Sequence, residues 1–383
     1  MKIKRKRPRF EAKTKTTKEE ESSDLFDRLP DDLVIFVLSK LSSSAACPAD
    51  FVSALIVCKR FNRLGLNQLI LARAGSNLFR IRAKNWSESA HRFLKQCVYC
   101  GSVEACYFLG MIRFYCLQNR ASGASLMAKA AIRSHAPALY SLAVIQFNGS
   151  GGSKTDKDLH AGVALCARAA YLGHVDALRE LGYCLQDGYG IRKNVPEGSR
   201  MLVQANAREL ASTFPSSTTL PCCARFSSTP RQHSRRHEVK NLRPRPNVAT
   251  LIDIDMSDQG CALCSDFGCN VTVPEPHPAN RFLLEWFELK GKQSGSDLRM
   301  CSHSGCGRPE TRPHEFRRCS VCGSVNYCSR GCQAHDWRQR HKDHCAPMEV
   351  WLNEAALGGA WGGVGFGLGG WVVDHGENEH LES

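Results

Sequence analysis

Apolar residues recur with a helical period soon after residue 24. In the segment LFDRLPDDLVIFVLSKL, the side chains of Leu33, Phe36, Val37 and Leu41 fall at i, i+3, i+4 and i+8, on one side of an α-helix. Pro30 suits the start of that helix, and the two aspartates after it are favourable near its positive end. The segment DFVSALIVCKRFNRL predicts a second short helix. Residues 24–75 are therefore predicted to form a small helical domain.

A repeated helical pattern follows between residues 97 and 201. The motif Ala-x3-Leu, followed by Gly or Ala, begins at Ala105, Ala138 and Ala177, which are 33 and then 39 residues apart. The same 39-residue spacing separates Ala130 from Ala169, Ala131 from Ala170 and Gly149 from Gly188. Helix pairs of this kind cannot bury their apolar faces alone. Residues 90–210 are therefore predicted to stack about three helix pairs into a short superhelix with a concave binding side, although a spacer without a ligand fits equally well.

Four further stretches lack this repeat. Residues 1–23 are basic and residues 211–250 are rich in Ser, Thr, Pro and Arg, a composition that favours disorder. The run KRKRPR is typical of a nuclear import signal and equally of a solvated tail. Residues 251–295 predict a short strand at LIDIDM and an amphipathic helix around Phe282, Leu283 and Trp286. Residues 346–383 form a glycine-rich tail.

Composition narrows the class of protein. A chain of 383 residues is long enough for two or three domains, and 51 basic against 37 acidic residues gives 51 − 37 = +14, which favours acidic partners. No stretch approaches the roughly 18 apolar residues of a membrane span. The segment MKIKRKRPRF lacks the apolar core of a secretion signal, so the 20 cysteines are expected to be reduced, inside the cell. In the repeats, buried structural thiols explain the cysteines best.

Two short motifs in residues 24–75 match a known family. They are Leu29-Pro30-x-x-Leu33 and, after about 25 residues, Val57-Cys58-Lys59-Arg60-Phe61-x-x-Leu64. This pattern resembles the F-box, although the loop SSSAACPAD is longer than usual. The resemblance implies docking to a Skp-type adaptor of a cullin-based ubiquitin ligase. The residues implied in that contact are Leu29, Pro30, Leu33, Val57, Cys58 and Phe61. The alternative is an ordinary small helical core.

The helix pairs of residues 90–210 resemble the Sel-like relatives of tetratricopeptide repeats.

The clearest chemical signal lies in residues 301–345. Four ligand pairs occur there: Cys301-x4-Cys306, Cys319-x2-Cys322, Cys328-x3-Cys332 and His341-x3-Cys345. A closed structural zinc site takes four such ligands, so the count fits two Zn²⁺ ions with none left over. Short strands are expected at FRRC and VNYC, and a helix from Ser329 to His341. A unit this small depends on its metal for stability. Upstream, Cys261-x2-Cys264-x4-Cys269 supplies only three sulfurs, so the sequence does not decide whether a third metal site lies there.

The order of these ligands separates zinc families. Six cysteines, one histidine and a final cysteine, with the sequence Tyr327-Cys328-Ser329-x2-Cys332-Gln333-x2-Asp336-Trp337-x3-His341-Lys342-x2-Cys345, resemble the MYND finger. A RING finger would place its histidine mid-order. Two departures stand out. The first pair is spaced x4 instead of x2, which leaves His303 as an alternative ligand, and one extra residue separates Trp337 from His341.

The MYND resemblance implies specific roles. The first zinc would take Cys301, Cys306, Cys328 and Cys332, and the second Cys319, Cys322, His341 and Cys345. His335 and His344 would be spare surface histidines. Gln333 and Trp337 would contact short proline-containing peptides, because an indole stacks on a proline ring. The alternative is that Trp337 forms the small core of the finger.

Catalysis is not expected, because the chain carries no nucleophile elbow, phosphate-binding loop or H-E-x-x-H motif, and all paired ligands are used in closed sites. The predicted architecture is mainly α, with a helical F-box, solenoid repeats and a small zinc-stabilised α+β finger joined by flexible linkers. It resembles F-box proteins with a C-terminal MYND finger, which implies a substrate-recognition subunit of an SCF-type ligase in the nucleus, the cytoplasm or both. The alternative is a nuclear transcriptional scaffold or corepressor. Nucleic acid is a weak candidate, since the finger offers no base-reading helix.

Overall fold

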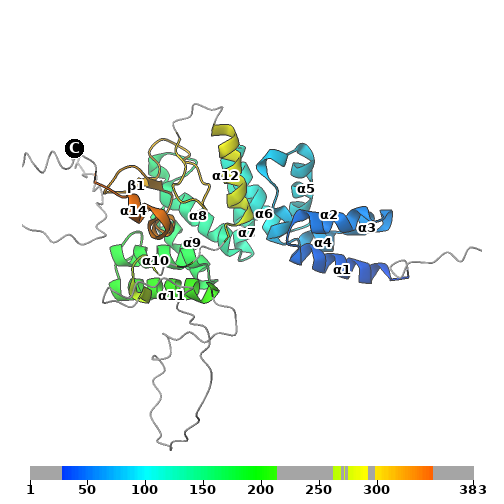
Figure 1. Cartoon of the computed structure of the whole chain (residues 1–383), viewed down its shortest axis with the longest axis horizontal. Helices are drawn as coiled ribbons and strands as arrows, with labels where there is room; N and C mark the ends of the chain where they lie inside the picture. Colours follow the sequence, from blue (N-terminus) through cyan, green and yellow to red (C-terminus); the bar gives the residue numbers. More distant parts are fainter. Residues whose placement is uncertain (1–27, 214–261, 269–270, 272–274, 292–297, 348–383) are drawn as a thin grey trace, which may run out of the picture.

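The computed structural model describes residues 28–213, 262–268, 271, 275–291 and 298–347, which are coloured in Figure 1. The predicted basic tail, the LIDIDM strand and nearly all of the predicted linker lie outside the described residues, as does the glycine-rich tail from residue 348. Among the helices that are described, none is both long and apolar enough to cross a membrane.

Helices make up most of the described chain. They are α1 (Asp31–Ser44), α2 (Pro48–Ile56), α3 (Lys59–Gly65), α4 (Gln68–Ala72), α5 (Glu88–Tyr99), α6 (Val103–Met111), α7 (Arg120–Ile132), α8 (Ala136–Asn148), α9 (Leu159–Tyr171), α10 (Val175–Asp187), α11 (Val195–Thr213), α12 (Pro278–Gly291), α13 (Arg330–Asp336) and α14 (Lys342–His344). Short 3₁₀ or π-helical turns are η1 (Ser76–Phe79), η2 (Ala83–Asn85), η3 (Ile112–Cys116), η4 (Lys154–Asp156), η6 (Ala262–Cys264) and η7 (Trp337–His341). Strands β1 (Arg317–Arg318) and β2 (Asn326–Tyr327) pair antiparallel, with Arg317 opposite Tyr327.

The N-terminal helices α1 to α4 form the blue end of the molecule in Figure 1. Their core contains Val34, Leu38, Phe51, Ile70 and Leu71, none of them more than 2% exposed. The small helical domain predicted for this region is therefore present.

Most of the predicted apolar stripe on α1 faces solvent, and the core is formed by neighbouring apolar positions. Leu33, Phe36 and Val37 are 51%, 55% and 52% exposed, while Val34 and Leu38 point inward. The reason is that α1 is apolar on two sides, so its periodicity is compatible with either side facing the core.

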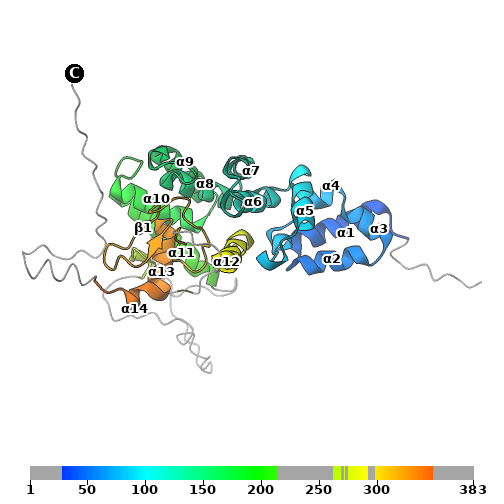
Figure 2. The same cartoon turned by 90° about the horizontal axis from the view of Figure 1, so that it is seen from above.

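The repeat region consists of three helix pairs, α6 with α7, α8 with α9 and α10 with α11, preceded by α5. In Figure 2, α7 and α9 lie along one edge as an outer layer, α6, α8 and α10 form the inner layer, and α5 stands beside α6. The motif alanines Ala105, Ala138 and Ala177 have no exposed surface, which lets neighbouring helices approach closely. The predicted solenoid of paired helices is confirmed.

The predicted amphipathic helix is present as α12, which packs between the N-terminal helices and the repeats. Its Phe282 and Leu283 are fully buried. The ring of Phe282 meets Trp86 edge-on at 5.4 Å and Phe108 at 5.8 Å. Glu285 Oε2 also accepts a hydrogen bond from the Ala83 amide at 2.9 Å. A segment that follows the repeats in the chain therefore packs beside their first helix (Figure 1).

The finger, residues 301–345, lies against the inner layer of the repeats. Figure 2 shows α13 and β1 beside α10, on the side away from α7 and α9. Sequence analysis predicts a concave binding side for the repeats, and the structure shows that the chain's own finger occupies that side.

Candidate metal centres and protein-binding surfaces

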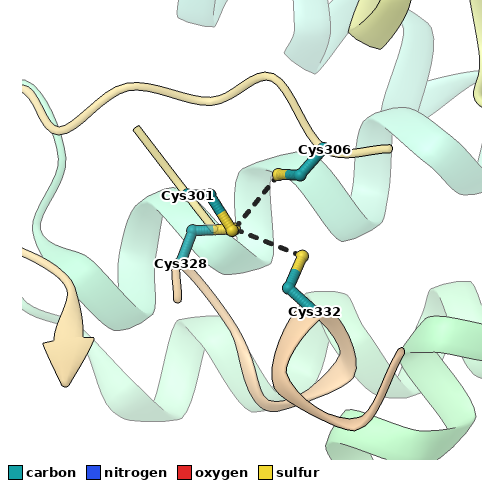
Figure 3. A group of neighbouring side chains, drawn as sticks. All are labelled: Cys301, Cys306, Cys328 and Cys332. Carbon is teal, nitrogen blue, oxygen red and sulfur yellow. Dashed lines mark hydrogen bonds between the residues drawn. The ribbon is translucent and has the colours of Figure 1, made fainter. Parts of the chain in front are cut away.

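The first group of four cysteines brings Cys301, Cys306, Cys328 and Cys332 together (Figure 3). All four are buried. The Sγ atom of Cys328 lies 3.5 Å from that of Cys306 and 3.6 Å from that of Cys332. A disulfide would place two sulfurs about 2.0 Å apart. A tetrahedral zinc with Zn–S bonds of about 2.3 Å separates them by about 3.8 Å, so this group fits zinc.

The second group contains Cys319, Cys322, His341 and Cys345, and the donor atoms lie within 4.8 Å of one another. Cys319 Sγ is 3.8 Å from Cys345 Sγ, and Cys322 Sγ is 3.6 Å from His341 Nε2. Three thiols and one imidazole at these separations again match tetrahedral zinc. The structure thus assembles all eight predicted ligands in the two interleaved groups that the MYND resemblance implies.

Local structure explains how the ligands converge. The amide of Cys332 donates to Ser329 Oγ at 3.1 Å, which caps α13 and directs its first turn toward the first group. Gly323 adopts a positive φ of 63° directly after Cys322, as a tight zinc knuckle requires. The paired strands β1 and β2 end beside Cys319 and Cys328. These strands and helix are the elements that the sequence predicts.

The structure accounts for both departures from the MYND pattern. The extra residue between Trp337 and His341 lies in η7, a π-helical turn, whose hydrogen bonds enclose one more residue than those of an α-helix, and His341 still belongs to the second group. The longer first spacing still brings Cys306 into the first group. His303 is not among those ligands, and its ring stacks on His335 with 5.3 Å between centroids. The first group therefore consists of the four predicted cysteines, and the alternative ligand His303 lies outside it.

Buried polar contacts attach the first group to helix α8. Arg308, only 4% exposed, donates to Ser141 Oγ at 2.8 Å and to Cys306 Sγ at 3.4 Å. Asn148 Nδ2 donates to the carbonyl of Cys328 at 2.8 Å. A four-thiolate zinc centre carries a net charge of about −2, which a buried guanidinium offsets.

Helix α10 holds the start of α13. Glu180 Oε2 accepts hydrogen bonds from the amides of Arg330 at 2.9 Å and Gly331 at 3.1 Å. Burial raises the pKa of the Glu180 carboxyl, and the nearby Arg330 guanidinium opposes that shift. The two amides have no partner within their own helix, so Glu180 satisfies two donors that the interface buries.

A second set of charged residues joins α13 to α10 and α11. Arg179, with no exposed surface, and Arg338 both donate to Glu209 Oε2 at 2.7 Å. His335 Nε2 lies 2.7 Å from Asp176 Oδ1. The expectation that His335 is a surface residue is wrong, because this contact leaves it 6% exposed. His344 is exposed, as predicted.

The proposed peptide-contacting residues Gln333 and Trp337 are half-buried. The ring of Phe267, from the segment around η6, lies 5.6 Å from the Trp337 ring at a 30° tilt. Asn206 Nδ2 holds this segment through the carbonyls of Leu263 and Ser265, at 2.9 and 2.8 Å. The chain's own residues therefore cover one side of Trp337, a contact with no local sequence signal.

The six predicted adaptor-contacting residues differ in exposure. Val57 is 70% exposed and Leu33 51%, Pro30 is exposed, and Leu29 and Phe61 are half-buried. Cys58 acts as the cap of α3, since its Sγ accepts from the Phe61 amide at 3.4 Å. Four more exposed apolar residues lie on helices α1 and α2. They are Phe36, Val37, Val52 and Ile56.

Other cysteines play no part in the two groups. In the repeats, Cys97, Cys106, Cys116, Cys166 and Cys184 are buried, as predicted, and Cys100 is half-buried. Burial raises the pKa of the Cys97 thiol to about 12, which keeps it protonated and unreactive. Cys264 is exposed, while Cys261 and Cys269 lie outside the described residues.

Comparison with known proteins shows that parts of the chain match two family models and that most of the chain is similar to two plant proteins. The family model of plant tetratrico peptide repeats matches residues 77–161, and that of the MYND finger matches residues 301–345. The F-box protein At1g67340 of Arabidopsis thaliana is 62% identical over 333 residues, which are 87% of this chain and 83% of that protein. The F-box protein At5g50450 of the same plant is 57% identical over 331 residues, covering 86% and 88%.

The fold and the ligand groups define a helical-repeat protein with a MYND finger. At this identity and coverage, the chain belongs to the family of F-box proteins that these two relatives represent. A solved Sel1 repeat protein from Oxalobacter formigenes is also similar, at 15% identity and a TM-score of 0.35, over 46% of this chain and 68% of that one. The family assignment does not depend on that structure.

Proposed function

We propose that the chain is the substrate-recognition subunit of an SCF-type cullin-based ubiquitin ligase. In this proposal the F-box end docks to a Skp-type adaptor on the cullin scaffold, and the repeats with the finger recruit a protein substrate. The supporting observation is the apolar surface of α1 and α2. Ile56 and Val57 are 75% and 70% exposed, beside half-exposed Leu33, Phe36 and Val37. A surface of this kind marks an interaction site.

Two structural Zn²⁺ ions are part of the proposal. Each four-ligand group is closed, with no position for a substrate, so the ions stabilise the finger and supply no catalysis. The ligase role is accordingly non-catalytic, and other subunits transfer the ubiquitin.

The nuclear scaffold remains the second candidate, with proline-containing peptides bound at Gln333 and Trp337. It needs an open face on Trp337, and Phe267 covers one side of that ring. The adaptor proposal needs no such opening. Residence in the nucleus, the cytoplasm or both is proposed for either function, with KRKRPR as the import signal.

A pulldown with a purified Skp-type adaptor tests the ligase proposal. The full chain is compared with the double variant Ile56→Asp/Val57→Asp and with Leu29→Ala/Pro30→Ala. The control is Ile132→Asp, which places an aspartate at a residue of the repeats that is 73% exposed. We expect capture by the wild type and the control, and loss in both F-box variants. Failure of a folded, zinc-loaded wild type to capture the adaptor would reject the proposal and favour the scaffold.

A further inference from the structure

Three large apolar side chains stand in solvent at the ends of the outer repeat helices. Tyr99 is the last residue of α5, Ile132 of α7 and Tyr171 of α9. Their exposed fractions are 90%, 73% and 89%. We call these three residues the outer rim. Single exposed apolar residues are ordinary on a protein surface, but the same exposure in three successive units is not.

The rim residues occupy structurally equivalent positions. Two residues after each one, the chain turns through a left-handed residue: Gly101 at φ 89°, Ser134 at φ 61° and Gly173 at φ 93°. The next residue then caps the following inner helix, and these caps are Ser102, His135 and His174. Because each turn has the same geometry, the three side chains emerge from the same edge of the solenoid.

Basic residues accompany the rim. Lys95, Lys129 and Arg168 are exposed and lie three or four residues before the rim residue of their helix, hence on the same face. Helices α7 and α9 contain no Asp or Glu at all. The acidic residues near the start of the inner helices α6 and α10 are paired with histidines: Glu104 with His135 at 3.1 Å, and Asp176 with His335 at 2.7 Å. The rim therefore combines apolar contacts with positive charge.

The position of the finger restricts where the repeats can bind a partner. The inner side of the repeats, the usual binding side of a short solenoid, is occupied by residues 301–345. A partner protein that binds the repeats must therefore contact the outer layer or its edges.

We propose that the outer rim binds an acidic peptide segment of a partner protein, whose apolar side chains contact Tyr99, Ile132 and Tyr171 while its carboxylates face Lys95, Lys129 and Arg168. Neighbouring helices lie about 8–10 Å apart, and one inner helix separates the helices that carry successive rim residues. Successive rim residues are therefore roughly 10–20 Å apart. An extended chain covers that distance in about three to six residues. The partner segment accordingly carries apolar residues three to six positions apart in an acidic sequence. This surface goes beyond the proposed function and requires no adaptor binding.

Fluorescence anisotropy with defined peptides tests the proposal. The probes are four labelled 20-residue peptides of Asp, Glu and Gly, with leucines every third, fourth, fifth or sixth position, and four matched peptides with Lys in place of the acids. The full chain is compared with Tyr99→Ser/Ile132→Ser/Tyr171→Ser and with Lys95→Glu/Lys129→Glu/Arg168→Glu. All six positions are exposed, so we expect unchanged thermal unfolding.

We expect at least one acidic peptide to bind the wild type, at least tenfold more weakly to either triple variant, and more weakly as salt rises. The lysine peptides should not bind. The control variant Ile56→Asp/Val57→Asp should bind the peptide like the wild type, which separates this surface from the adaptor-docking face. The proposal is overturned if no acidic peptide prefers the wild type to the serine variant. A loss confined to the charge-reversed variant overturns it too, because binding would then be non-specific charge attraction.

Discussion

The two ends of this molecule use their residues in opposite ways. The F-box end buries a small apolar core and leaves Phe36, Ile56 and Val57 in solvent. The interface between the repeats and the finger buries charged residues as well as apolar ones, with Arg179 fully buried and Glu180 only 5% exposed. Exposed apolar groups and buried charged groups are both unfavourable unless they have a partner. At the finger end that partner is within the chain, and at the F-box end we propose that it is another protein.

This difference predicts how each end responds to substitution. Changes at the buried charged contacts should lower stability, because they leave unpaired groups behind. Changes at the exposed F-box residues should leave stability intact and abolish an interaction.

The largest effect should follow loss of the first metal group. Cys328→Ser removes a ligand from the group that contacts α8 through Arg308 and Asn148, whereas Cys319→Ser removes a ligand from the second group. Structural zinc contributes on the order of 10 kcal/mol of apparent folding free energy. Each variant should lose one zinc per chain by elemental analysis. Only Cys328→Ser should also expose the inner repeat helices to limited proteolysis, and equal cleavage in both variants would contradict the interface described here.

Glu209→Ala should produce the next largest loss. The substitution leaves the guanidinium groups of Arg179 and Arg338 without their shared carboxylate, which costs about 3–5 kcal/mol for a buried pair. Denaturant unfolding measures the change. The matched control on the same helix is Glu197→Ala, whose partner Arg200 is 74% exposed, and for which about 0–0.5 kcal/mol is expected. Similar losses in the two variants would show that Glu209 is not part of a buried network.

Glu180→Ala should cost less, about 1–3 kcal/mol, because it leaves the amides of Arg330 and Gly331 unsatisfied. Glu180→Gln keeps one oxygen as acceptor and should lose a smaller part of that stability. The same unfolding experiment compares them. If the glutamine variant is as unstable as the alanine variant, charge attraction to Arg330 outweighs the two hydrogen bonds.

Ile56→Asp/Val57→Asp should change the unfolding free energy least, by about 0.5 kcal/mol or less, since both side chains are exposed. Thermal unfolding provides the measurement, on the same samples as the adaptor pulldown. A large drop in stability would mean that this surface belongs to the core, and would remove the main support for adaptor docking.

Local sequence patterns predict much of this architecture. The alanine and leucine spacing predicts the paired helices, and the four ligand pairs together with the MYND resemblance predict both metal groups. These features depend on neighbours in sequence or on a repeated unit. The direction of α1 was not predictable, because Leu33 and Val34 are equally apolar and only the packed helices α3 and α4 select which one is buried.

The attachment of the finger to the repeats was also not predictable from pattern. It depends on polar residues far apart in the chain, such as Glu180 with Arg330 and Asp176 with His335, separated by 150 and 159 residues. Each of these side chains alone is typical of a solvated helix surface. The covering of Trp337 by Phe267 has the same origin.

We infer that the finger and the inner repeat helices fold as one body, separate from the exposed F-box face. Hydrogen exchange of the full chain, measured with bound zinc and after chelation, distinguishes this from a finger that folds alone. We predict that chelation reduces amide protection in α8 and α10 as well as in residues 301–345, and leaves α1 and α2 unchanged. Loss of protection confined to residues 301–345 would contradict the claim, because the finger would then be an independent module.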